Sequence, residues 1–174
     1  MQSRTPDTGR TGATGELLSA ELASAVAGAR RRAARDGDRQ IDTAHLLHTL
    51  LEADPGVRDC LHGGPARVAR LLGYLVQRTI GYALRWSGTV EDSGALPALP
   101  AAVVPGWSPA AAGAMSKARA RAHARGAGRV EGVDLLAALV RDPRCRAVEV
   151  LRRAGADPAL IAARLEDPAC SECG

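Results

Sequence analysis

Two histidines, His45 and His48, lie three residues apart in a segment with helical periodicity. Residues with this spacing share one face of a helix, so both imidazoles could bind one metal ion if a third ligand were present. The sequence places no third ligand beside them, and a histidine at a helix start usually forms local hydrogen bonds. We therefore expect no metal site and no cofactor.

The second chemical candidate is the C-x-x-C pair formed by Cys170 and Cys173 at the C-terminus. A zinc site of this type requires a second pair. Cys60 and Cys145 lie in apolar segments, where a thiol behaves as a small core residue. We interpret the C-terminal pair as part of a disordered tail. A redox disulfide and an intermolecular metal clip are the alternatives.

Catalytic motifs are absent from the sequence. There is no G-x-S-x-G motif and no activated cysteine context. There is also no G-x-x-x-x-G-K-[ST] phosphate loop, and the only lysine, Lys117, follows Ser116 within a predicted helix. Without backbone amides that surround the phosphates and a lysine that reaches them, the chain cannot be a P-loop ATPase. We predict a protein that is not an enzyme.

Arginines form one cluster in each half of the chain, and Arg30, Arg32, Arg119 and Arg121 are the candidate anion-binding residues among them. Positive charge near a helix C-terminus stabilises the helix dipole, which is the structural interpretation. The functional interpretation is a surface that binds anions or nucleic acid. The chain has two Trp, two Tyr and no Phe to stack on bases, so we do not expect single-strand binding. Binding of nucleic acid through contacts from these arginines to its phosphates alone is the alternative that the sequence leaves open.

Helices must position these residues, because the apolar content is mainly Ala, Leu and Val and the aromatic fraction is 2%. The first helix is expected to begin with Ser19 as its N-cap and to end at Gly37. A second begins at Asp42 or Thr43 and stops at Asp54-Pro55-Gly56. A short helix over Val57–Leu61 follows, and Pro65 opens a longer one that runs to about Trp86.

Three segments lack helical periodicity. Residues 1–16 and 167–174 are predicted to be flexible tails, and residues 87–106, which contain Pro97, Pro100 and Pro105, a linker loop. These boundaries divide the chain into a first helical repeat over 17–86 and a second over 107–166.

The two halves resemble each other in sequence. A shift of 89 residues places Leu18–Ala53 on Trp107–Asp142 without a gap. Ser19 then meets Ser108, and Gly37 meets Gly126, so the helix start and stop positions coincide. We predict an internal duplication: an all-α fold of two tandem four-helix repeats, related by a pseudo-twofold axis and packed as one domain.

The chain resembles the N-terminal repeat domain of the Clp family of AAA+ unfoldases over about residues 17–166. The resemblance is carried by four segments: Ile41–Leu47, Trp107–Pro109, Val130–Leu136 and Val150–Asp157. It implies a domain that sits on an ATPase ring, recognises substrates and docks adaptor proteins. Because the chain has no phosphate loop, it is similar to a free-standing copy of that recognition domain.

Some members of this family bind phosphorylated arginine at two equivalent sites, through a Glu in a Thr-Glu-His motif. Ala44 and Val133 stand at the positions of that Glu, and neither side chain can accept a charge-assisted hydrogen bond. We therefore do not expect this activity. The flanking positions are Thr43 and His45 in the first repeat, and Gly132 and Asp134 in the second.

The first functional hypothesis is a non-catalytic module that recognises proteins, with the Clp ATPase ring or its substrates as partners. Its protein-binding residues are expected at the start of each second helix: Thr43, Ala44, His45, Gly132, Val133 and Asp134. The alternative is a basic helical nucleic-acid-binding or regulatory protein. With neither a secretory signal nor a membrane-spanning run in the sequence, we expect a cytoplasmic location.

Overall fold

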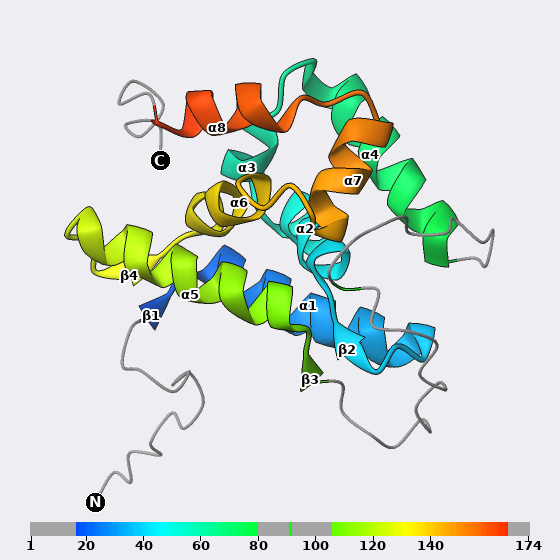
Figure 1. Ribbon diagram of the computed structural model, residues 1–174, viewed down its shortest axis with the longest axis horizontal. Coiled ribbons are helices and arrows are strands. Elements are labelled where there is room, and N and C mark those ends of the chain that lie inside the picture. Colours follow the sequence, from blue (N-terminus) through cyan, green and yellow to red (C-terminus); the bar gives the residue numbers. More distant parts are fainter. Residues whose placement is uncertain (1–16, 80–90, 92–105, 167–174) are drawn as a thin grey trace, which may run out of the picture.

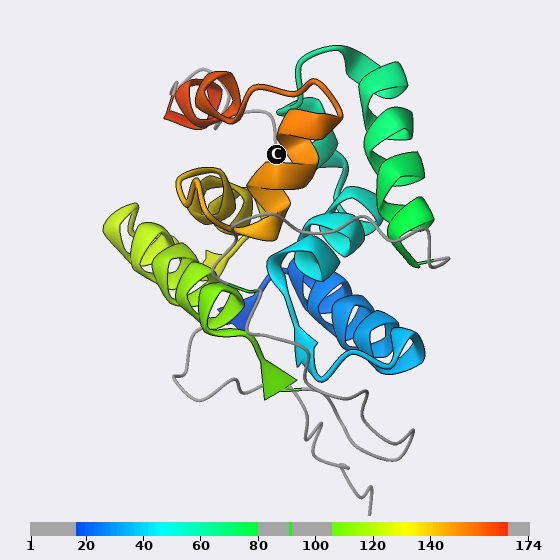
Figure 2. The same ribbon diagram turned by 45° about the vertical axis from the view of Figure 1, so that its right-hand side comes forward.

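The computed structural model describes residues 17–79, 91 and 106–166, which form eight α-helices and four two-residue strands. In chain order these are β1 (Leu17–Leu18), α1 (Ala20–Asp36), β2 (Gln40–Ile41), α2 (Thr43–Ala53), α3 (Pro55–Asp59), α4 (Gly64–Thr79), β3 (Gly106–Trp107), α5 (Pro109–Ala124), β4 (Arg129–Val130), α6 (Gly132–Val140), α7 (Arg146–Arg153) and α8 (Pro158–Glu166). The order strand, helix, strand and three helices thus occurs twice (Figures 1 and 2).

Capping residues set most of the helix boundaries. The Ser19 hydroxyl accepts the N–H of Leu22, and Gly37 ends α1 in the left-handed conformation with φ of 72°. Asp42 caps α2 and Ser108 caps α5, so these four expected boundaries are confirmed.

The later boundaries were predicted less well. The short helix predicted over Val57–Leu61 begins two residues earlier, at Pro55, because the Asp54 carboxylate accepts the N–H of Val57 and so caps it. The helix that Pro65 opens is described as far as Thr79. Its predicted extension to Trp86 and both predicted tails lie outside the described residues.

The short strands, which the sequence did not predict, join the two halves. β1 pairs in parallel with β4, and β2 pairs in parallel with β3. The N–H of Ser19 donates to Val130 O at 2.9 Å, and the N–H of Ser108 donates to Ile41 O at the same distance. These two hydrogen bonds exchange under the 89-residue shift, as expected of two repeats related by a twofold axis. The duplication itself and the domain boundaries stay predictions.

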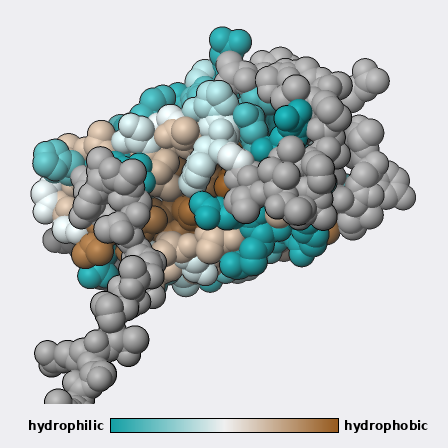
Figure 3. Space-filling view, turned by 90° about the horizontal axis from the view of Figure 1, so that it is seen from below, coloured by the Kyte–Doolittle hydropathy of each residue, from teal (hydrophilic) through white to brown (hydrophobic). Residues whose placement is uncertain are grey.

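The strand pairs lie with α1 and α5 on the lower side of the molecule in Figure 1. Seen from below, apolar residues gather in the middle of this face (Figure 3). Leu17 of β1 is 57% exposed, whereas Leu18 and Trp107 are partly buried against the core. We give the name lower apolar face to three residues of the strand pairs on this side: Leu17 and Leu18 of β1, and Trp107 of β3.

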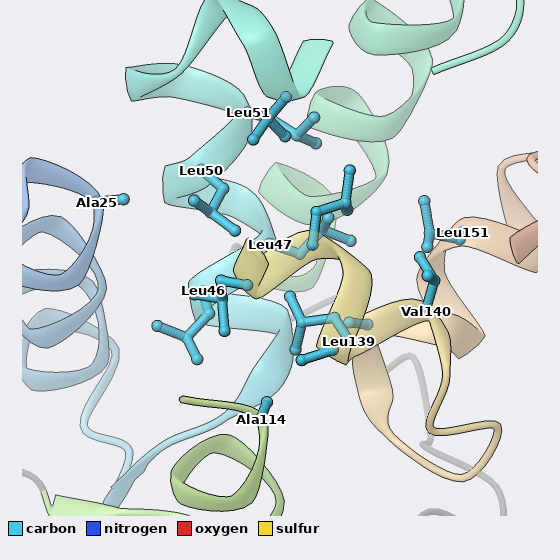
Figure 4. Packing of buried hydrophobic residues seen from close by; sticks show 14 of the residues in the cluster. Ala25, Leu46, Leu47, Leu50, Leu51, Ala114, Leu139, Val140 and Leu151 are labelled. Atoms are coloured by element: carbon cyan, nitrogen blue, oxygen red, sulfur yellow. The ribbon is translucent and has the colours of Figure 1, made fainter. Parts of the chain in front are cut away.

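Helices α2 and α6 form the centre of the core, with α1 and α5 packed along them (Figure 4). Every residue from Thr43 to Leu51 is buried, which is typical of a helix enclosed on all sides. The outer helices present alanines to this centre, among them Ala25 and Ala114. Small side chains let helix axes approach closely, so a chain without Phe still fills its core.

Candidate functional site

The start of α2 is held by a capping box and by an ion pair to the second repeat. Asp42 Oδ1 accepts the N–H of His45 at 2.8 Å, and His45 Nδ1 accepts the N–H of Asp42 at 3.1 Å. Asp42 Oδ2 lies 2.7 Å from Nη1 of Arg146, the first residue of α7. Because Asp42 is buried, this pair fixes the start of α2 against the start of α7.

Glu91, from the segment between the repeats, places a buried carboxylate at the same point, where the starts of α2 and α7 meet. Its Oε1 accepts the N–H of Thr43 at 2.8 Å and the hydroxyl of Ser108 at 2.7 Å. Its Oε2 accepts the N–H of Arg146 at 2.9 Å and also the hydroxyl of Thr43. Three helix starts, those of α2, α5 and α7, therefore meet at one side chain.

The carboxylate of Glu91 replaces a missing N-cap. Cys145 occupies the N-cap position of α7 and forms no side-chain capping bond. The N–H groups at the start of α7, which have no acceptor within the helix, are instead satisfied by Glu91 and by the Thr43 hydroxyl, which accepts the N–H of Ala147 at 3.1 Å. Sequence reasoning missed Glu91 and Arg146. The available signal was a helix start whose capping position holds a cysteine.

The start of α6 is built differently. Gly132 stands at the position of Thr43, and a Cβ atom there would overlap Asp54 Oδ2 and lie 3.1 Å from Val57 Cγ2. The close approach of α3 therefore requires glycine at this position. The carboxylate of Asp54, which caps α3, occupies the space beside the start of α6. A carboxylate thus lies at the start of both α2 and α6, but the two come from different parts of the chain.

Asp134, the equivalent of His45, has no exposed surface. Its carboxylate accepts two hydrogen bonds from Arg125 Nη2, at 2.7 and 2.8 Å, and lies 3.3 Å from Arg121 Nε. It also accepts the N–H of Glu131 at 3.0 Å. The last turn of α5 is thereby attached to the first turn of α6.

The six predicted protein-binding residues gather in two groups, one at the start of α2 and one at the start of α6. Five of them are buried: Thr43, Ala44, His45, Gly132 and Asp134. Val133 is partly buried and packs against the core. A bound peptide could contact Val133 directly, and it would depend on the others only through the shape of the junction. The assignment of these positions to protein binding stays a prediction.

The four predicted anion-binding arginines are not equivalent. Arg32 Nη2 donates to both carboxylate oxygens of Glu52, at 2.9 and 3.0 Å, and Arg121 pairs with Asp134. Arg119 is partly buried and Arg30 is exposed. Two of the four guanidinium groups thus already pair with a carboxylate of the chain. Anion binding by this set stays a prediction.

His48 does not join His45 in a common ligand group. Its Nε2 lies 3.3 Å from Glu52 Oε1, next to the Arg32 pair. Burial lowers the pKa of His48 to about 4, and the nearby positive charge of Arg32 adds to this shift. His48 is therefore neutral at neutral pH.

Cys145 is expected to react slowly with thiol reagents in the native protein. Burial raises its pKa from 9.0 to about 11, which lowers the thiolate fraction at pH 8 about 100-fold. Cys60 is also buried, in agreement with the core role expected of both cysteines. The measurement is Ellman's reagent on a Cys170→Ser, Cys173→Ser variant, with and without guanidinium. Prompt labelling of this variant without denaturant would contradict the burial of both thiols.

Within the part of the chain that the structure describes, no helix combines the length and the apolar character needed to cross a membrane.

No family model matches the chain, and no curated protein matches its sequence. Solved structures do match. The Hsp104 N-terminal domain from Candida albicans superimposes with a TM-score of 0.64 at 13% identity, covering 85% of this chain and 88% of that chain.

Two further structures are similar at the same level. The N-terminal domain of the caseinolytic protease associated chaperone ClpD from Arabidopsis thaliana gives a TM-score of 0.60 at 17% identity, covering 85% of this chain and 91% of that chain. A chain from a malarial protein secretion system gives a TM-score of 0.60 at 17% identity, covering 86% of this chain and 92% of that chain. The protein has the all-helical fold of the Clp and Hsp104 N-terminal domains.

Proposed function

We propose that this chain is a non-catalytic module that binds unfolded, apolar polypeptide segments for a Clp-type unfoldase or protease system. The observation that supports this most strongly is the likeness to N-terminal domains of chaperones over 85% of the chain. The Clp ATPase ring and its protein substrates are the partner classes that this likeness suggests. A cytoplasmic location and the role of an adaptor belong to the same proposal.

The lower apolar face is the surface that we assign to this binding. It combines an exposed leucine, Leu17, with two partly buried apolar side chains. Figure 3 shows apolar residues gathered on the same side of the molecule, and a contiguous exposed apolar patch is a mark of a protein-interaction site. The strand pairs that carry these residues continue into the helices of the candidate site, because β2 leads into α2 and β4 leads into α6. The buried residues at the starts of α2 and α6 therefore support the face from within.

The test uses fluorescein-labelled casein as an unfolded substrate and measures fluorescence anisotropy. We expect binding that changes little with salt, because it depends on apolar contact. Leu17→Ser should weaken it several-fold. Leu160→Ser is the matched control, because Leu160 lies on α8 and is 53% exposed. Equal loss in both variants, or no binding at all, would overturn the proposal.

A parallel titration with a duplex oligonucleotide tests the alternative function. Phosphate contacts release counterions, so nucleic-acid binding falls steeply as salt rises. Oligonucleotide binding that shows this dependence and is lost in an Arg30→Ala, Arg119→Ala variant, without casein binding, would favour the nucleic-acid hypothesis.

A further inference from the structure

Three side chains able to bind a metal ion converge where α1 ends and α2 begins. They are Asp36, Asp38 and His45, and their ligand atoms all lie within 4.8 Å of one another. His45 Nε2 is 3.0 Å from Asp38 Oδ2 and 4.0 Å from Asp36 Oδ2. In a tetrahedral zinc site, ligand atoms are about 3.3 Å apart, because each lies about 2.0 Å from the ion. Small side-chain movements would bring all three atoms to that spacing.

The backbone of the turn fixes the two carboxylates. Gly37 stands between them in the left-handed conformation, and its N–H and that of Asp38 are bonded to carbonyls of the last turn of α1. This arrangement holds Asp36 and Asp38 on the side of the turn that faces α2. The ligand geometry therefore does not depend on a flexible loop.

The imidazole of His45 is held from its other nitrogen. Nδ1 lies 2.8 Å from Asp42 Oδ1, and the side chain of His45 is 1% exposed. In the capping box Nδ1 accepts the N–H of Asp42, whereas zinc binding requires the other tautomer: Nδ1 then carries the proton and donates it to Asp42 Oδ1, and the lone pair of Nε2 is left for the ion. A histidine that ligates a metal through one nitrogen and donates to a carboxylate through the other is the usual arrangement in zinc sites.

The second repeat links its corresponding helices, α5 and α6, in another way. Under the 89-residue shift, Asp36 corresponds to Arg125 and His45 to Asp134. Arg125 and Asp134 form a direct ion pair. In the first repeat the corresponding positions hold a carboxylate and an imidazole, to which Asp38 adds a second carboxylate. These are nitrogen and oxygen ligands that a cation can bridge.

We propose that Asp36, Asp38 and His45 form a binding site for one Zn²⁺ ion. Two carboxylates and one imidazole suit zinc, whereas magnesium prefers oxygen ligands alone. The side chain of Asp38 is 42% exposed, so the ion can enter from solvent and can keep water as a fourth ligand. The bound ion links the end of α1 to the start of α2, as the Arg125–Asp134 pair links α5 to α6.

The test is competition for Zn²⁺ with a chromophoric chelator at pH 7.5, on the full chain. All variants carry Cys170→Ser and Cys173→Ser, so that the C-terminal thiols do not contribute. We expect one ion per chain in this background and a rise in the thermal midpoint with zinc. Asp38→Asn should weaken binding at least about tenfold. Because Asp38 is partly exposed, this variant should fold normally, and His45→Gln should abolish binding.

Asp59→Asn and His62→Gln are the matched controls, because both residues are exposed and lie outside the cluster. They should leave the affinity unchanged. The proposal is overturned if the background protein binds no zinc, or if Asp38→Asn and His45→Gln bind zinc as tightly as the controls.

Discussion

Replacing Glu91 with alanine is expected to lower the free energy of unfolding by about 3–5 kcal/mol, the usual cost of breaking a buried charged network. The variant leaves four donor groups without their acceptor: the N–H and hydroxyl of Thr43, the hydroxyl of Ser108 and the N–H of Arg146. Each buried donor that loses its partner costs about 1–3 kcal/mol. The measurement is urea denaturation followed by circular dichroism.

Two controls separate this effect from the loss of a surface charge. Glu91→Gln keeps an amide oxygen as acceptor, so it should cost less than half as much as the alanine variant. Asp59→Ala removes an exposed carboxylate from α3 and should change stability by less than about 0.5 kcal/mol. If Glu91→Ala resembles Asp59→Ala, the Glu91 carboxylate does not hold the three helix starts together.

The helices and their ends could be predicted because their causes are local. Ser19, Asp42 and Ser108 each accept an N–H three residues further along the chain, and Gly37 ends its helix through its own backbone conformation. The 89-residue self-similarity also predicted that two halves of one fold pack together. The short strands escaped prediction because two-residue segments carry no alternation of polar and apolar residues.

The candidate site was predicted only in part, because its connections are distant in sequence. Glu91 bonds to residues 48 and 55 positions away, and it lies in a segment whose composition indicates only a loop. The pairing of Asp42 with Arg146 spans 104 residues. Capping signals identified the start of α2 correctly. They could not show that Thr43, which accepts the N–H of Ala147 from the other repeat, and His45, which lies beside the end of α1, are both buried.

Replacing Asp134 with alanine is expected to cost about 3–4 kcal/mol, since it removes a fully buried carboxylate that Arg121 and Arg125 face. It also leaves the N–H of Glu131 without its acceptor. Asp134→Asn keeps an oxygen for that N–H but loses the charge, so we expect an intermediate loss. Thermal and urea unfolding of the three proteins give the comparison.

A double-mutant cycle with Arg125→Ala determines how much of this loss comes from the ion pair. The guanidinium of Arg125 is partly solvated, so we expect a coupling energy of about 1 kcal/mol, with the rest of the loss assigned to Arg121 and the cap. A cost below about 1 kcal/mol for Asp134→Ala would mean that packing alone joins α5 to α6. The comparison of that junction with Asp36, Asp38 and His45 would then lose its force, because an electrostatic link would not be required at this place in the fold. A large cost would show that the second repeat needs such a link, and zinc binding at Asp36, Asp38 and His45 would then show that the first repeat forms one at the corresponding place.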